Sequence, residues 1–167
     1  MVLGQDSNFT PESFIKCYNS DLANDYGNLL NRVTGLIGKN HGGIMPVLGE
    51  LTPAEIEIKK QGDALPVFVK GLIDNFKVQE AVVAAIEYVR VLNKYMEIQA
   101  PWKLAKTDIK AAERVLYAAA EGLKVATELL APVMPTKTKI VLDILGKPGS
   151  TIKSHPALFP RIEVEKQ

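Results

Sequence analysis

The sequence has very little cysteine, very little histidine and no long apolar run. Cys17 has no second cysteine to pair with, and His41 and His155 lie far apart without the spacing of a metal site. No stretch approaches the roughly 18 apolar residues of a membrane span, and no signal peptide is evident. These absences predict no metal, no membrane partner and a reducing compartment, the cytoplasm.

An excess of charge is also missing, since the formal net charge is only +1. A protein that binds nucleic acid through a basic patch carries more positive charge, so any RNA must be bound by a few placed groups. The patterns GxGxxG, GxxxxGK[ST] and GxSxG are absent as well. We therefore expect no catalytic residues and no cofactor in this chain.

Apolar residues recur at helical spacing almost throughout. The first helix begins at Thr10-Pro11, where the hydroxyl caps the helix and proline occupies its first position. We expect an interruption near Asn19-Ser20 and an end by Gly38. The apolar stripe of this helix comprises Ile15, Tyr18, Leu22, Tyr26, Leu29, Val33 and Leu36.

Four further helices are predicted from their apolar spacing and their end signals. Thr52 and Glu55 form a capping box, after which Gly62 and Pro66 indicate a kink or break. A third helix carries Val82, Ile86, Val89, Leu92 and Met96 and ends before Pro101, a fourth covers 109–130, and a fifth covers 135–145 with Gly146 as its cap.

No segment alternates like a strand, so the fold class is all-α. We expect a bundle of about five helices over residues 1–146, followed by an extended Pro- and Gly-rich tail over 147–167 that leaves the bundle as an arm or linker.

One polar group stands out on the first helix. Asn24, Asn28 and Arg32 are spaced four apart and lie opposite the apolar stripe, with Asp21 and Asp25 beside them. Asparagine and arginine can read the edge of an unpaired base. A solvated face with Arg32 bound to Asp25 is the more common outcome for such spacing.

Trp102 is the only tryptophan and directly follows Pro101. A lone tryptophan at a corner between helices usually packs as a lid on the core. An indole held at a rigid corner is also a platform on which an unpaired base can stack. The residues alone rank the lid first.

Three stretches together resemble the anticodon-binding domain of bacterial methionyl-tRNA synthetases. They are DLANDYGNLLNR within residues 4–33, NKYMEIQAPWKLAK over 93–106 and LLAPVMPTKT over 129–138, and the tail LFPRIE is similar to the segment that follows the bundle in that family. The matches occur in family order and span nearly the whole chain.

The resemblance implies a class I synthetase-type helical bundle that recognises the CAU anticodon of methionine tRNA. Asn28 and Arg32 match family residues that contact anticodon bases, and Trp102 matches the tryptophan on which a base stacks. Asn93 matches a nearby polar position and is a supporting contact. The family's catalytic domain, which uses ATP and Mg²⁺ to attach methionine, is expected to be this chain's intramolecular partner.

The sequence departs from the family in lacking the catalytic domain and its signatures, so Met1-Val2-Leu3 looks like a cut into a longer chain. Whether the chain itself is an enzyme stays open, although no catalytic site is expected in it, and the resemblance implies that its parent is a ligase. Two other functions stay open. One is a helical protein-interaction module with no role in RNA binding, and the other is a stand-alone enzyme, which needs a pocket with convergent titratable groups.

Overall fold

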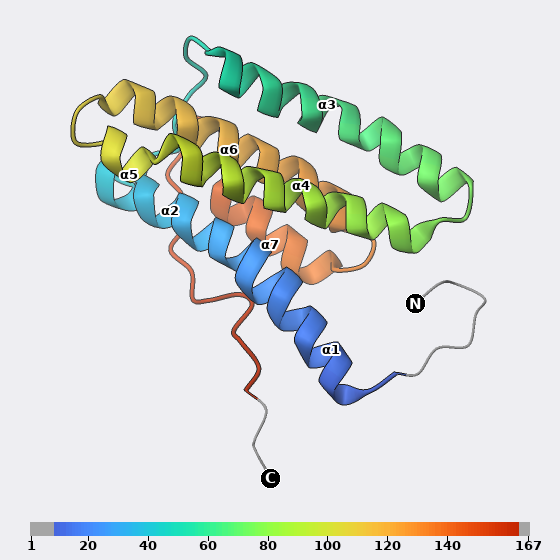
Figure 1. Ribbon diagram of the computed structural model, residues 1–167. Helices are drawn as coiled ribbons and strands as arrows, with labels where there is room; N and C mark the ends of the chain where they lie inside the picture. Colours follow the sequence, from blue (N-terminus) through green and yellow to red (C-terminus); the bar gives the residue numbers. More distant parts are fainter. Residues whose placement is uncertain (1–8, 164–167) are drawn as a thin grey trace.

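The computed structural model describes residues 9–163, so the start at Met1-Val2-Leu3 lies outside it. The described residues form helices joined by short connections, with a single isolated β-bridge between Ile44 and Thr151. The elements are α1 (Pro11–Cys17), η1 (Tyr18–Gly27), α2 (Asn28–Asn40), α3 (Pro53–Asp74), α4 (Val78–Gln99), α5 (Pro101–Leu104), α6 (Ile109–Leu130) and α7 (Pro135–Leu145). The predicted all-α fold class is confirmed (Figure 1).

The first helical rod runs without a break from α1 through η1 into α2. Thr10 caps it as predicted, accepting a hydrogen bond from the backbone N–H of Ser13. The interruption expected near Asn19-Ser20 is absent, because the chain passes through this region as a π-helix instead of leaving the helical path. The rod ends at Asn40, two residues beyond Gly38.

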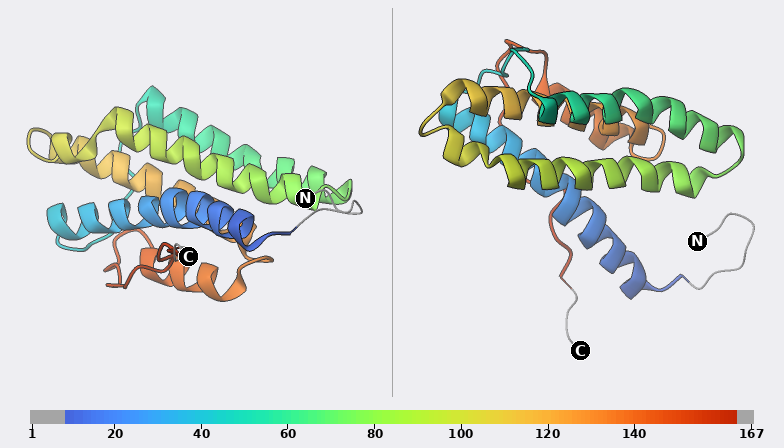
Figure 2. Two further views of the ribbon diagram at one scale, coloured as in Figure 1. Left: turned by 60° about the horizontal axis from the view of Figure 1, so that its bottom comes forward. Right: turned by 45° about the horizontal axis from the view of Figure 1, so that its top comes forward.

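The core lies between this rod, α4, α6 and α7. Figures 1 and 2 show α5 at one end of the bundle, with the α3–α4 turn and the beginning of α1 at the other. Apolar side chains from four of these elements are fully buried, among them Tyr26, Leu29, Leu92, Met96, Leu116, Leu123 and Leu145. Their packing fixes the rod that carries the predicted RNA-binding residues.

Of the kink or break predicted at Gly62 and Pro66, the break is wrong, since α3 is continuous from Pro53 to Asp74. Pro66 has no N–H and so removes one helical hydrogen bond, but the residue lies on the exposed face of α3. Ile58 before it and Val69 after it are both buried in the bundle. Tertiary packing on both sides of the proline therefore outweighs the local preference for a break.

Gly62 has a packing role instead, and we expect Gly62→Ala to destabilise the protein. A Cβ at Gly62 would lie 2.6 Å from the hydroxyl oxygen of Tyr88, which is buried and donates a hydrogen bond to the Ile58 carbonyl at 2.9 Å. Overpacking costs about 1–3 kcal/mol and exceeds the roughly 1 kcal/mol gained from the higher helix propensity of alanine. A lower urea midpoint with an unchanged slope is the expected result.

Gly71→Ala in the same helix is the matched control, because nothing lies within 4 Å of its added Cβ. This variant should raise the urea midpoint. Adding Tyr88→Phe to Gly62→Ala should recover part of the loss. If Gly62→Ala and Gly71→Ala shift the midpoint alike, the close packing of Tyr88 on Gly62 is refuted.

The remaining helix ends agree with the sequence predictions. α4 stops at Gln99 before Pro101, and α6 and α7 cover the predicted residues 109–130 and 135–145. Gly146 follows α7 with a φ of 59°, a backbone conformation that suits glycine. Proline and glycine thus set these boundaries.

The tail packs back along the first rod, whereas the sequence indicated an arm leading away from the bundle. Leu158 and Phe159 are buried, and the Phe159 ring meets the Tyr26 ring edge-on with centroids 5.3 Å apart. The Asn19 side chain donates to the Ile162 carbonyl at 2.8 Å and accepts from the Ile162 N–H at 2.9 Å. Residues 147–163 therefore cover part of the core.

Candidate functional site

Arg32 and Trp102 come together although they are distant in the sequence. The Arg32 guanidinium carbon lies 5.2 Å from the centroid of the Trp102 ring, within the range of a cation–π contact. Trp102 is 37% exposed, so its ring is neither a buried lid nor a free side chain. The pair forms a partly accessible surface where α2 meets α5.

The corner that carries Trp102 is built from two backbone features. Ala100 adopts a left-handed conformation with a φ of 45° and donates its N–H to the Met96 carbonyl at 3.0 Å, which ends α4. Pro101 then starts the one-turn helix α5 and is buried. Because a left-handed alanine is strained, the surrounding packing must hold this corner in place.

Arg32 does not bind Asp25, contrary to the ion pair that the spacing favoured. Asp25 instead accepts a hydrogen bond from Arg90 at 2.7 Å. Among the described residues, the carboxylate nearest to Arg32 is that of Glu97, with 4.0 Å between Nη1 and Oε1. Glu97 is largely exposed, so this ion pair is weak. The guanidinium therefore keeps donors that a ligand can use.

Asn28 lies one turn before Arg32 on α2 and is exposed. Asn24, the preceding member of the same row, accepts a hydrogen bond from Arg161 of the tail at 3.4 Å. Asn28 and Arg32 are thus placed on neighbouring turns, with Trp102 against the second of them.

Asn93 faces the helical rod. Its Nδ2 donates to the Asp25 carbonyl at 2.9 Å and to the Val89 carbonyl at 3.3 Å. Its Oδ1 is buried and has no hydrogen-bond partner in the described part of the chain. The geometry places Asn93 behind the Asn28–Arg32 row.

The described residues contain no group of three or more histidine, cysteine, aspartate or glutamate side chains that could hold a metal ion. Cys17 is exposed. Its hydrogen bond to Asp21, together with partial burial, raises the pKa of the thiol, which disfavours a nucleophilic thiolate. Among residues 9–163, no helix is long and apolar enough to cross a membrane.

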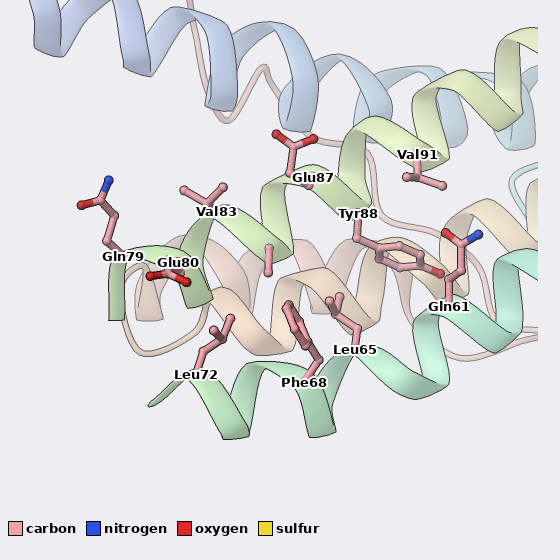
Figure 3. Close-up of a pocket in the computed structure, with 11 residues that line it drawn as sticks. Gln61, Leu65, Phe68, Leu72, Gln79, Glu80, Val83, Glu87, Tyr88 and Val91 are labelled. Atoms are coloured by element: carbon pink, nitrogen blue, oxygen red, sulfur yellow. The ribbon is translucent and has the colours of Figure 1, made fainter. Parts of the chain in front are cut away.

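Sequence reasoning missed an apolar groove of about 610 Å³ between α3 and α4 (Figure 3). Phe68 is 59% exposed in it, and Glu80 and Glu87 lie at its rim. The apolar lining consists of Leu65, Phe68, Leu72, Val83, Ala84, Tyr88 and Val91. The only signal in the sequence is that these side chains widen the apolar stripes of the two helices beyond the face that packs in the core.

No family model matches the chain. Among curated proteins, the methionine–tRNA ligase of Deinococcus radiodurans is 44% identical over 96% of this chain and 26% of its own length. That of Mycobacterium leprae is 32% identical over 96% of this chain and 33% of its own length. The chain thus spans about a quarter to a third of these relatives.

Solved structures agree with these matches. Methionyl-tRNA synthetase of Mycobacterium tuberculosis in its free state superposes with a TM-score of 0.93 at 29% identity, covering 98% of this chain and 37% of that one. The same enzyme in complex with methionyl-adenylate gives a TM-score of 0.91 at 29% identity, covering 96% and 35%. The chain is therefore homologous to a segment of the methionyl-tRNA synthetases.

Proposed function

We propose that this chain binds the CAU anticodon of methionine tRNA through Asn28, Arg32 and Trp102. The observation that carries the proposal is the contact between Arg32 and Trp102, which joins a fork of donors to an aromatic ring on one accessible surface. Asn28 lies on the adjacent turn. Three side chains suited to unpaired bases are therefore neighbours.

In this proposal Trp102 stacks on a base that has left the loop, which contributes about 1–3 kcal/mol with little regard to sequence. Asn28 and Arg32 select the base, because a wrong base leaves a desolvated donor or acceptor without a partner. Asn93 supports this surface from behind by holding Asp25.

The positive charge near Trp102 is better suited to binding the phosphate backbone of RNA than the net charge of the whole chain, only +1, suggests. Residues 94–110 contain four lysines, at positions 94, 103, 106 and 110, against Glu97 and Asp108. Within residues 9–163, none of these lysines has a carboxylate within 4.0 Å, whereas Lys59 and Lys70 on α3 are paired. Unpaired lysines attract phosphates in a salt-dependent way.

We further propose that the chain acts as part of a methionyl-tRNA synthetase in the cytoplasm. Another part of that enzyme activates methionine with ATP and Mg²⁺ and attaches it to the tRNA. The matches to methionine–tRNA ligases over a quarter to a third of their length support this division of roles.

The groove between α3 and α4 favours a second candidate, a helical protein-interaction module. An exposed apolar groove is the surface such a module uses to bind an amphipathic helix. Loss of all hairpin binding together with capture of a helical peptide in the groove would favour this alternative.

The test is a calorimetric titration of the 167-residue chain with an RNA hairpin whose loop presents CAU, and with hairpins changed at each of these three bases, at one fixed salt concentration. We expect the CAU hairpin to bind most tightly. Equal affinity for all hairpins would refute anticodon recognition.

Arg32→Ala should reduce the preference for the CAU hairpin by about tenfold, or about 1.4 kcal/mol, because the guanidinium donors are lost. The melting temperature should fall by no more than about 2–4 °C, since the ion pair to exposed Glu97 is weak. Lys70→Ala on α3 is the control and should alter neither quantity. A preserved preference in Arg32→Ala would remove Arg32 from the site.

A further inference from the structure

The junction just before Asn28 is unusual, because the ten residues of η1 are π-helical. Most π-helices are single turns and many occur at functional sites. The wide turns of η1 give way to α-helical geometry at Asn28, the first residue of α2. The direction in which the Asn28 side chain points therefore depends on how the end of η1 is held.

Arg90 of α4 holds this end of η1 from the side. Its Nε donates to Asp25 Oδ2 at 2.7 Å and its Nη2 donates to Asp21 Oδ1 at 2.7 Å, while Nη1 contacts Glu87 on its own helix. The side chains of Arg90, Asp21 and Asp25 are all half-buried. A planar guanidinium that binds two carboxylates of a neighbouring helix fixes the rotation of that helix about its own axis, as well as the distance between the two helices.

Asp25 passes this constraint on to Asn28. The Asp25 carbonyl accepts the backbone N–H of Asn28, and it also accepts Asn93 Nδ2 from α4. Asp25 is thus held by its carboxylate and by its carbonyl. Arg32 lies one turn further from this contact, in a part of α2 that Val33 and Ile37 anchor in the core.

We propose that Arg90 is a positioning residue that fixes the Asn28 side chain through Asp25 and so sets which base Asn28 accepts. This inference rests on the proposed function. It assigns a role in base selection to a residue on a different helix, which acts through its contact with Asp25.

Arg90→Met keeps the apolar stem and removes the donors. We expect about a three- to tenfold loss of preference for the CAU hairpin at one loop position, the position also affected by Asn28→Ala, with the other positions unchanged. The two substitutions combined should cost little more than either alone, whereas Arg90→Met and Trp102→Leu should be additive. Arg90→Lys should restore part of the preference, because one ion pair to the carboxylates remains possible.

Lys124→Met is the control, since it removes a half-buried cation that is paired with Glu121 of its own helix. A uniform loss across all hairpins, or additive effects of Arg90→Met and Asn28→Ala, would show that Arg90 only stabilises the bundle. If Arg90→Met does not fold, Asp25→Asn weakens the same contact and replaces Arg90→Met in the comparison of single and double variants.

Hydrogen exchange of the free protein separates this inference from the proposed function. We expect Arg90→Met to speed exchange of the Asn28 backbone amide by about tenfold while the Val33 amide is unaffected. Unchanged Asn28 exchange would overturn the positioning role even if the hairpin binds. Faster Asn28 exchange without any hairpin binding would overturn the proposed function and the base-selecting part of this inference, and would leave only the structural link.

Discussion

Replacing Glu55 by alanine is expected to lower the free energy of unfolding by about 3–5 kcal/mol, the usual cost of removing one partner from a buried ionic network. Glu55 is 1% exposed. Its carboxylate accepts hydrogen bonds from the Thr52 backbone at 2.9 Å, the Thr52 hydroxyl at 2.5 Å and the Tyr95 hydroxyl at 2.6 Å, and it lies 3.2 Å from Arg114. The substitution leaves Tyr95 and Arg114 without their partner.

The melting temperature should fall by about 6–20 °C, at about 2–4 °C per kcal/mol for a domain of this size. Glu57→Ala is the matched control, because Glu57 is an exposed residue of the same helix whose carboxylate accepts from Gln61. Similar melting temperatures for the two variants would show that the Glu55 network contributes no stability.

The pH dependence gives a second readout of the same network. Burial alone raises the pKa of Glu55, but hydrogen bonds from Thr52 and Tyr95 and the charge of Arg114 outweigh it, and the net pKa lies below the usual value. A lowered pKa in the folded state means that the network stabilises the protein above the unfolded pKa of about 4.3 and loses this contribution as the pH falls through the folded pKa. Between pH 5 and pH 3, the free energy of unfolding of the unsubstituted chain should fall by more than that of the Glu55→Gln variant.

Trp102→Leu is expected to weaken binding of the CAU hairpin by about 1–3 kcal/mol, or about 5- to 150-fold, because the stacking surface is lost. Leucine keeps an apolar side chain over the corner between α4 and α5, so the bundle should remain folded. Fluorescently labelled hairpin and the variant chain, titrated at fixed salt, provide the measurement.

Trp102→Phe is the control that retains an aromatic face, and it should keep most of the affinity that Trp102→Leu loses. The alternative is that Trp102 serves as a lid on the core and does not bind RNA. In that case Trp102→Leu and Trp102→Phe would bind the hairpin equally well, and both would have markedly lower melting temperatures.

Helix boundaries were predictable because they depend on local chemistry. The Thr10-Pro11 start, the Thr52–Glu55 capping box and the stop before Pro101 each follow from a few adjacent residues. The break predicted at Pro66 was wrong, because α3 stays continuous there through packing on both sides of the proline, and that packing is not a local property. The same reason explains the tail, whose contacts with the first rod join residues more than a hundred positions apart.

The candidate site was predictable in its residues more than in its contacts. Helical spacing placed Asn28 and Arg32 on one face, but it also favoured an ion pair between Arg32 and Asp25. Arg90, which lies 65 positions away from Asp25 in the sequence, takes that carboxylate. Spacing along one helix gives no information about a competing cation on another helix. The resemblance implied one site for Asn28, Arg32 and Trp102, and the direct contact between Arg32 and Trp102 came from the fold.

Trp102 is the only tryptophan in the chain, so its emission reports on the proposed site alone. The most direct test of anticodon recognition is therefore a fluorescence titration of the chain with the CAU hairpin at fixed salt. We predict a saturable change in Trp102 emission that requires higher concentrations of hairpins altered in the CAU bases. Emission that stays unchanged with the CAU hairpin, or that responds identically to every hairpin, would contradict the account.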